Sequence, residues 1–417
     1  MNPKRTHPAP ILDSLSEMEN PFKQSCFSAE PFFKGKSVAG ANIDYEYALK
    51  FIYSYQGSAA TFNAYRREVE RLLQWSWRIE AQSILLHKRE HVEDFVRFCL
   101  DPPLAWIGTA NAPRFVVKDG ARVVNGKWRP FVASVSKEMH RQGIEPVKKQ
   151  YLMSQSALKA LFAILSSFYD FLCQEELLES NPVALIRQKS KFIIREQQLS
   201  PVRRLSNLQW EYLIETAGNM AIQDPENHER TLFIMNCLYA MYLRVSELVA
   251  DERSSPIMND FSRDHDNQWW FNVTGKGNKS RKITVSDAML DALKRYRRHR
   301  GLSSLPTPND ASPLIPKQLG TGPMTSTRHL RAIVQNCFDY THERMTQDGL
   351  EEDAADLKAA TVHWLRHTGI SEDVKTRPRE HVRDDAGHQS MQTTDRYIES
   401  DDRERHQSGR SKPISES

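Results

Sequence analysis

The stretch TVHWLRHTG, residues 361–369, gathers several side chains that can carry chemistry on one expected helix. His363 and Arg366 stand three positions apart, so they share a face of that helix. His363 and His367 stand four positions apart, which is also the spacing of a zinc-binding histidine pair. Trp364 occupies the position where a zinc protease needs its glutamate, and no third ligand is obvious. We therefore expect no metal at this stretch.

Three further short segments carry a cation or a tyrosine. Arg244 stands in LYAMYLRVSELVAD, and Lys276 stands in TGKGNKSRKITV, in a turn between two expected strands. His388 stands in DDAGHQS, nine residues before Tyr397 in TTDRYIES. Each residue alone has an ordinary structural explanation, because ion-paired arginines, turn lysines and half-buried tyrosines are common. The combination of all four segments in this order is what points to a function.

That combination resembles the tyrosine recombinase (phage integrase) family, including its Xer-like members. The matching text is LRVSEL, GKGNKSRKI, HWLRHT and AGHQSxxTTxRY, within roughly residues 205–400. The resemblance implies a mainly α fold with a small β-hairpin or sheet, in two domains: a helical, SAM-like core-binding domain and a mixed α/β catalytic domain. It places the following residues at the family's six functional positions: Arg244, Lys276, His363, Arg366, His388 and Tyr397.

The resemblance implies strand cleavage and rejoining without metal, ATP or any other cofactor. Tyr397 would attack the scissile phosphate and form a 3′-phosphotyrosyl enzyme. Lys276 would protonate the leaving 5′ oxygen as general acid, with Lys279 and Lys282 as alternatives for that role. The sequence also lacks GxxxxGK[ST] and any GxGxxG after a strand, which disfavours nucleotide hydrolysis.

The remaining four positions suit the charge that the reaction develops. Two guanidinium groups can stabilise the non-bridging phosphate oxygens by paired hydrogen bonds, and the resemblance gives this role to Arg244 and Arg366. His363 would accept the tyrosine proton as general base, and His388 would donate a hydrogen bond to the phosphate. We expect His367 only to pack or cap beneath the site.

Length and composition bound these expectations. The chain has 417 residues, which favours two domains with tails, and 39% hydrophobic residues exclude global disorder. Its 57 Lys and Arg against 53 Asp and Glu leave a net charge of only +4, so charge alone does not predict a DNA partner.

Five scattered cysteines without a CxxC pair favour a reducing cytoplasm. The apolar run 232–243 is too short to span a membrane, and the N-terminus lacks a signal peptide's apolar core, so we expect a cytoplasmic protein without membrane contact.

The pattern along the chain predicts a sequence of segments. These are an irregular lead-in (1–43), a helical core-binding DNA-binding domain (44–190) with an insertion (102–150), a basic linker (191–205), a catalytic domain (206–400) and a polar tail (401–417). We expect helices from about 61, at 90–100, 158–178, within 231–250, and at 287–300, 326–346, 362–373 and 377–386, and strands at 268–273 and 281–285.

Two local departures from the family pattern lead to further expectations. Tyr242 stands where many relatives have a glycine, so we expect the preceding helix to run straighter into Arg244. The tail after Tyr397 lacks the apolar stripe that many relatives dock on a neighbouring protomer, so we do not expect contacts between protomers through the tail.

Basic residues outside the six positions are candidates for DNA contact. Segment 114–132 contains the turn signals Asp119-Gly120 and Asn125-Gly126 and mixes cations with aromatics, although a solvated surface hairpin explains it equally well. The candidates are Arg66, Lys118, Arg122, Lys127, Arg129, Lys189, Lys191, Arg203, Arg204 and Lys279.

The function implied is that of a site-specific DNA recombinase, or integrase, that integrates, excises or resolves a mobile element or chromosome. Its implied partner is double-stranded DNA with inverted half-sites, bound by a tetramer on synapsed sites. Two alternatives stay open: a type IB topoisomerase that relaxes DNA as a monomer, and a catalytically silent DNA-binding relative. The silent relative would lack at least one of the six residues, and all six are present.

Overall fold

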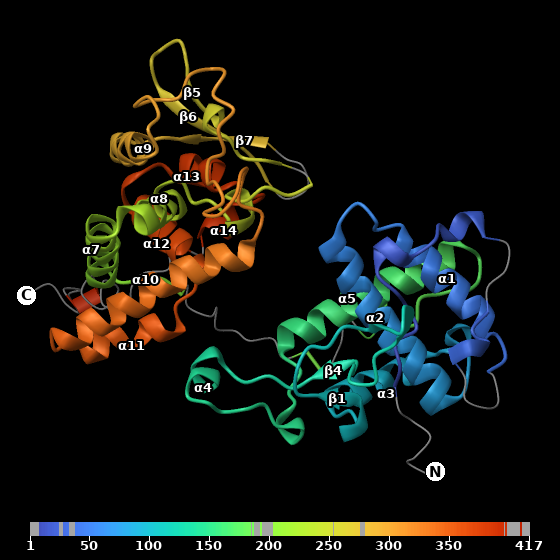
Figure 1. Ribbon diagram of the computed structural model, residues 1–417. Helices are drawn as coiled ribbons and strands as arrows, with labels where there is room; N and C mark the ends of the chain where they lie inside the picture. Colours follow the sequence, from blue (N-terminus) through green and yellow to red (C-terminus); the bar gives the residue numbers. More distant parts are fainter. Residues whose placement is uncertain are drawn as a thin grey trace, which may run out of the picture. The chain divides into compact units, whose positions relative to one another are not determined.

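The computed structural model describes residues 8–24, 28–32, 38–184, 186, 192–193, 203–252, 254–275, 280–395, 397 and 409–410. The chain divides into two compact units, residues 1–197 and 198–417, each with its own hydrophobic core. Figure 1 colours both units along the sequence. The division falls inside the segment 191–205 that the sequence predicts as a basic linker.

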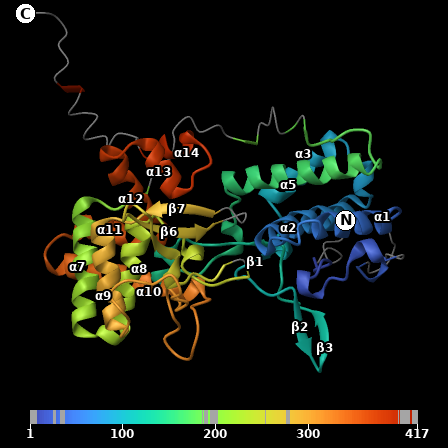
Figure 2. The same ribbon diagram turned by 90° about the horizontal axis from the view of Figure 1, so that it is seen from above.

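Unit 1 is mainly helical. Its longer helices are α1 (Ala41–Tyr53), α2 (Ala59–Trp75), α3 (Arg89–Leu100) and α5 (Gln155–Gln174) (Figure 2). The helices expected from about 61, at 90–100 and at 158–178 are therefore present as α2, α3 and α5. α5 ends four residues early because Glu176 takes a left-handed φ of 59°, which terminates a helix.

Helix α5 is the most apolar long helix of the described chain. Its length and hydropathy would suffice to cross a membrane, although the sequence directed attention to the shorter run 232–243. Half of its apolar window is buried inside the structure. Phe162, Leu165 and Phe168 are fully buried in the core of unit 1, and this packing accounts for the helix's hydropathy.

The described residues before α1 include three short 3₁₀ helices, Leu15–Glu17, Pro21–Lys23 and Glu30–Phe32, and part of this segment is packed. Ile11 and Leu12 are buried in the core of unit 1, and their backbone amides donate to Oε1 of Glu70 at 2.7 and 3.1 Å. Glu70 is itself buried in α2 and also pairs with Arg114 at 2.8 Å. One carboxylate thus ties the lead-in and the insertion to α2.

The insertion at 102–150 contains short strands. β2 (Phe115–Lys118) and β3 (Ala121–Val124) form an antiparallel hairpin around Asp119-Gly120, which confirms that turn signal (Figure 2). Asn125-Gly126 instead forms a turn in which the Trp128 amide donates to the Asn125 carbonyl. β1 (Ile107–Gly108) pairs in parallel with β4 (Phe131–Val132), and α4 covers Lys137–Arg141.

The described part of unit 2 consists mainly of helices, together with one small sheet. Its helices are α7 (Asn207–Gln223), α8 (Pro225–Ala240), α9 (Asp287–His299), α10 (Thr327–Gln347), α11 (Glu351–Ala359), α12 (Val362–Thr376), α13 (Arg379–Ala386) and α14 (Met391–Asp395) (Figure 1). A capping box of Ser206 and Gln209 opens α7, with both reciprocal hydrogen bonds formed. Helix α11 was not predicted.

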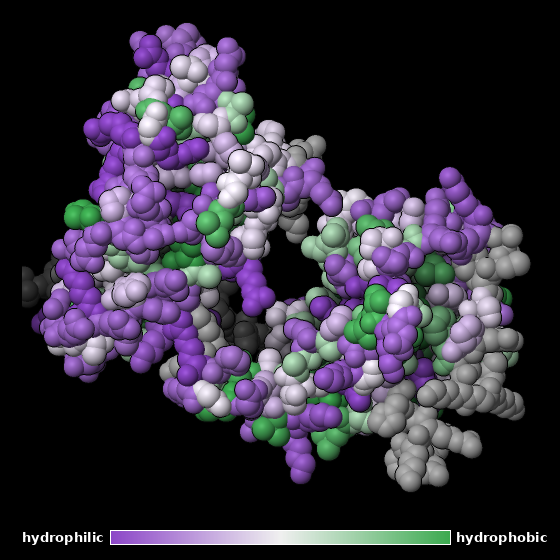
Figure 3. All heavy atoms as spheres, viewed as in Figure 1, coloured by the Kyte–Doolittle hydropathy of each residue, from purple (hydrophilic) through white to green (hydrophobic). Residues whose placement is uncertain are grey.

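The sheet of unit 2 is antiparallel in the order β5-β6-β7. β6 (Trp269–Thr274) and β7 (Ser280–Thr284) confirm the two predicted strands, and their register pairs Phe271 with Ile283. β5 (Phe261–Arg263) was missed because it is very short. On the faces visible in Figure 3, hydrophilic side chains dominate both units, in keeping with a mean hydropathy of -0.60.

Helices α8 and α12 pack closely because α12 carries a glycine at the contact. A Cβ placed on Gly369 would overlap the backbone carbonyl of Tyr239 and press on the ring of Tyr242. Backbone atoms of α8 cannot give way as a flexible side chain can. Gly369 therefore sets the distance between the two helices that carry the site described below.

Substitution of this glycine tests the packing. We expect Gly369→Ala to lower the free energy of unfolding by about 2–4 kcal/mol, since the added methyl overpacks a backbone contact. The matched control is Gly218→Ala in α7, where nothing lies within 4 Å of an added Cβ. That control should gain about 0.5–1 kcal/mol from helix propensity. Equal effects of the two substitutions in urea unfolding would contradict the contact.

Candidate active site

Five of the six residues singled out by the sequence come together in unit 2. Arg244 follows α8, His363 and Arg366 lie on α12, and His388 and Tyr397 lie in the segment from the end of α13 to just after α14. The charges of Arg244 and Arg366 act on both His363 and His388, and the charge of Arg244 acts on Arg366. The sixth residue, Lys276, lies outside the described residues.

Arg366 is the buried cation of the group, with 5% of its surface exposed. Its guanidinium donates to two backbone carbonyls, those of Tyr242 and Ala386. Burial, followed by the charge of Arg244, lowers the pKa of Arg366 to about 10, so it stays cationic at neutral pH. Because both acceptors are neutral, its positive charge remains available to an anion.

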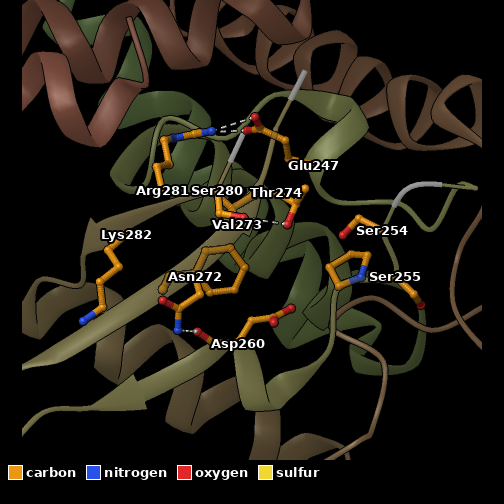
Figure 4. Close-up of a pocket in the computed structure, with 12 residues that line it drawn as sticks. Glu247, Ser254, Ser255, Asp260, Asn272, Val273, Thr274, Ser280, Arg281 and Lys282 are labelled. Atoms are coloured by element: carbon orange, nitrogen blue, oxygen red, sulfur yellow. Dashed lines mark hydrogen bonds and ion pairs between the residues drawn. The ribbon is translucent and has the colours of Figure 1, made fainter. Parts of the chain in front are cut away.

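Glu247 joins two arginines from different elements, and Figure 4 shows its interaction with one of them, Arg281. This buried carboxylate accepts from Nη1 of Arg244 at 2.9 Å and from Nη1 and Nη2 of Arg281 at 2.8 and 3.0 Å. Burial alone would raise its pKa, but the hydrogen bonds and charge of Arg281 outweigh burial and lower it. Arg281 also donates to the Asp385 carbonyl at 2.9 Å. Strand β7 is thereby fixed to the Arg244 turn and to the end of α13.

Sequence reasoning missed Glu247 and Arg281 as parts of the site. A signal existed for Glu247, because LRVSEL places it three residues after Arg244, within reach across one turn. In the structure it closes that turn by accepting from the Arg244 amide at 2.8 Å. Nothing in the sequence connects Arg281 with Glu247, since the two residues meet only through the fold.

The expectation that the helix runs straighter into Arg244 is wrong. Helix α8 ends at Ala240, and Tyr242 takes a left-handed φ of 49°, a conformation that glycine adopts more easily. The Tyr242 hydroxyl donates to Asp373 on α12 and accepts from Nη1 of Arg377 at 3.0 Å. These contacts hold Tyr242 in place, so that its carbonyl can receive the Arg366 guanidinium.

Tyr397 is buried among histidines. Its hydroxyl lies 2.6 Å from Nδ1 of His367, and its ring stacks on the His388 ring at 5.7 Å between centroids and 13° between planes. The Tyr397 amide donates to the Thr394 carbonyl at 2.9 Å, which fixes the residue at the end of α14. His367, which the sequence predicted only to pack beneath the site, therefore contacts the oxygen expected to react.

Burial keeps all three histidines neutral at pH 7. It lowers the pKa of His363, and it lowers the pKa values of His367 and His388 to about 4, with nearby cations adding to each shift. His388 has Nδ1 at 3.0 Å from Oγ1 of Thr394 and Nε2 at 3.4 Å from Nη2 of Arg366. Since arginine can only donate, Nε2 of His388 accepts, and the proton of the neutral ring is on Nδ1.

The structure describes both strands that flank the Lys276 segment, β6 up to Thr274 and β7 from Ser280. Val273 pairs with Arg281, and the hydroxyls of Thr274 and Ser280 lie 3.3 Å apart. Both strands line a pocket beside Glu247 (Figure 4). Lys282, one alternative for the acid, lies over the ring of Trp270, 5.4 Å from its centroid. Lys279, the other, lies outside the described residues.

The predicted DNA contacts outside the site differ in exposure. Arg66 is 7% exposed and donates to Asn63 and to the Asp13 carbonyl, so this burial is incompatible with the predicted surface contact. Arg122 pairs with Asp13 at 2.6 Å. Arg129 and Arg204 are half-buried, whereas Lys118, Lys127 and Arg203 are exposed. Lys189 and Lys191 lie outside the described residues.

Comparisons with known proteins identify a family model and several similar sequences. A model of the phage integrase family matches residues 203–404. The tyrosine recombinase XerC of Leptospira interrogans is 26% identical over 252 residues, which cover 60% of this chain and 70% of that protein. The XerD of Rickettsia bellii is 29% identical over 37% of this chain and 47% of its own length. For the XerC of Chlorobaculum parvum the values are 26%, 32% and 39%, so the chain spans less than half of these last two relatives.

Two solved structures share the fold. The XerH site-specific recombinase bound to a palindromic difH substrate aligns with a TM-score of 0.53 at 13% identity, over 88% of this chain and 84% of that chain. The Tn1549 transposon integrase in complex with a circular intermediate DNA aligns with a TM-score of 0.51 at 15% identity, over 88% and 98%. The predicted fold class, mainly helical with a small sheet in two domains, is confirmed.

Glu247 provides a stability test of the site. We expect Glu247→Gln to lower the free energy of unfolding by roughly 3 kcal/mol at pH 7, because it leaves Arg281 without its buried countercharge. The contribution of Glu247 is present above its unfolded pKa of 4.5 and is lost as pH falls through the lower folded pKa. In urea unfolding, the difference in the free energy of unfolding between wild type and Glu247→Gln should therefore become smaller in acid.

The control for this test is an exposed ion pair. Asp291 pairs with Lys294 at 2.9 Å but keeps 74% of its side chain exposed. Asp291→Asn should change stability by less than about 0.5 kcal/mol. A Glu247→Gln effect that is equally small, or that does not depend on pH, would contradict the central role of this carboxylate.

Proposed function

Because residues 203–404 belong to the phage integrase family, we propose that the protein is a site-specific DNA recombinase. It cleaves and rejoins DNA strands through a 3′-phosphotyrosyl intermediate, and so integrates, excises or resolves a mobile element or chromosome. The observation that carries the proposal is the buried Tyr397, whose hydroxyl contacts His367 and whose ring stacks on His388, the histidine that contacts the cationic Arg366. The reaction retains the energy of the phosphodiester bond, so neither ATP nor metal is needed.

The phosphate would bind at the cations. Arg366 is buried, its acceptors described above are two backbone carbonyls and the neutral ring of His388, and Arg244 is one-third exposed, so both arginines can donate to non-bridging oxygens. His388 would complete this set by donating its ring N–H to the phosphate in place of its present contact with Thr394. Burial of the cations strengthens their interaction with the charge that develops in the transition state.

Proton transfers would complete the cleavage. In this proposal Lys276, which stands between β6 and β7 in the sequence, protonates the leaving 5′ oxygen. The family resemblance assigns removal of the Tyr397 proton to His363, which lies on the same helix as Arg366. Rejoining reverses both transfers, with the 5′-hydroxyl of another strand as the attacking group.

The proposed partner is double-stranded DNA with inverted half-sites, bound by four protomers on two synapsed sites. The XerH and Tn1549 integrase structures are complexes with DNA, which supports a DNA partner here. The segment proposed to bind the core of the site is 44–190, followed by the linker at 191–205 and the catalytic segment 206–400. The protein would act in the cytoplasm, where its DNA is.

A covalent adduct tests the reaction. The substrate is a nicked duplex that carries the sequence selected by the full chain from a pool of random duplexes. We expect an adduct between protein and DNA that survives SDS, forms in EDTA and is absent from Tyr397→Phe, because only the phenol oxygen can attack. Adduct formation is measured by gel shift under denaturing conditions.

Three outcomes separate this proposal from its alternatives. An adduct that persists in Tyr397→Phe contradicts the nucleophile. Selective binding without any adduct in the wild type identifies a silent DNA-binding relative. Relaxation of plasmids that lack the selected sequence, without strand exchange between two copies of it, identifies a topoisomerase.

Salt dependence tests the hairpin of the insertion. If Lys118 and Lys127 neutralise phosphates, the double variant Lys118→Ala/Lys127→Ala should lower the slope of log affinity against log salt by about 1.8. The weakening should be similar for selected and unrelated DNA, because phosphate contacts carry no sequence information. Lys358→Ala in the acidic helix α11 is the control. An unchanged slope in the double variant would identify a solvated surface hairpin.

A further inference from the structure

The Tyr397 hydroxyl already has a specific partner in the structure. It lies 2.6 Å from Nδ1 of His367, which projects from α12 one position after Arg366. The two rings are tilted by 39° with their centroids 5.4 Å apart. This is the geometry of a hydrogen bond between a phenol and an imidazole, and not of simple packing.

The other two histidines of the site are placed differently. His388 stacks on the Tyr397 ring, and its Nε2 is engaged by Arg366. His363 lies one helical turn before His367, with 6.5 Å between their ring centroids, and the charges of Arg331, Arg366 and Arg244 act on it. Of the hydrogen bonds between Tyr397 and these histidines, the structure records the one to His367.

We infer that His367 is a catalytic residue of the proposed reaction, and that its Nδ1 accepts the Tyr397 proton when the phenol oxygen attacks the scissile phosphate. His363 then contacts the phosphate together with the arginines. The inference rests on the proposed function and changes the assignment of the base that the family resemblance gives.

The step balances without a further reactant. As the O–P bond forms, the O–H bond of Tyr397 breaks and its proton moves to Nδ1 of His367, which becomes imidazolium. The P–O5′ bond breaks, and the leaving oxygen takes its proton from the general acid. On rejoining, His367 returns the proton to the phenolate oxygen that departs from phosphorus.

The surroundings of His367 suit this role. Burial, followed by the charges of His363 and Arg366, lowers its pKa to about 4, so the ring is neutral and able to accept a proton at pH 7. Tyr397 and His388 face it from the segment after α13. An incoming phosphate adds negative charge beside the ring, which favours the imidazolium form when the phenol begins to react.

The experiment is single-turnover cleavage of the selected nicked duplex across pH. Glutamine can hold the Tyr397 hydroxyl but cannot take its proton. We expect His367→Gln to slow cleavage by about 10²- to 10⁴-fold at pH 7. The residual rate should rise about tenfold per pH unit, because the fraction of phenolate then depends on pH below the tyrosine pKa of about 10. Imidazole added to His367→Ala should restore part of the rate.

Two matched variants complete the experiment. His381→Gln changes an exposed histidine on α13 and should leave rate and pH profile as in wild type. His363→Gln should slow cleavage without producing the rise with pH. The inference is overturned if His363→Gln gives the rising profile in place of His367→Gln, or if His367→Gln is slow at every pH and His367→Ala does not respond to imidazole.

Failure of the inference is distinct from failure of the proposed function. If Tyr397→Phe abolishes the adduct while His367→Gln cleaves like wild type, the recombinase stands and His367 is not the base. If both His367 variants unfold, the ring nitrogens of ¹⁵N-labelled histidine are compared between the wild type and Tyr397→Phe. A Nδ1 resonance of His367 that does not shift on removal of the hydroxyl then overturns the inference.

Discussion

The site depends on one buried guanidinium that is held by backbone carbonyls. Arg366 joins the end of α8, through the carbonyl of Tyr242, to the end of α13, through that of Ala386. A charge this deeply buried is tolerated only when its donors are satisfied, so both chain segments must adopt one conformation. The Arg244 turn and the His388 segment follow directly from these two carbonyls. The hydrogen bonds of Arg366 that fix the conformation of these two segments are therefore also the ones that position the catalytic residues.

The cations of the site are compensated by negative charge to different extents, and this leaves positive charge for an anion to bind. Glu247 is the countercharge of Arg281 and also pairs with one guanidinium nitrogen of Arg244, Nη1. The direct hydrogen-bond partners of Arg366, in contrast, are neutral. Three histidines stay uncharged under the influence of burial and of these cations. The region is thus organised to receive an anion before any anion is present, which is what preorganised stabilisation of a transition state requires.

Much of this arrangement was accessible from sequence, and the exceptions share a cause. Helical periodicity predicted α2, α3, α5 and α12 within a few residues, because apolar spacing along one helix is a local signal. The roles of Arg281 and His367 were missed, since their partners lie 34 and 30 residues away in the chain. The left-handed Tyr242 was mispredicted because glycine preference is only a statistical guide, and contacts from α12 override it here.

The conformation of Tyr242 also bears on how such a site diverges. Where many relatives have a glycine, this chain has a residue whose hydroxyl bridges Asp373 and Arg377, while Arg377 pairs in turn with Asp385 at 2.6 Å. A glycine at position 242 would remove the bridge, and a tyrosine placed there without the acidic and basic partners would bury an unsatisfied hydroxyl. Because each contact needs its partner, we expect the effects of substitutions at these four residues to be non-additive.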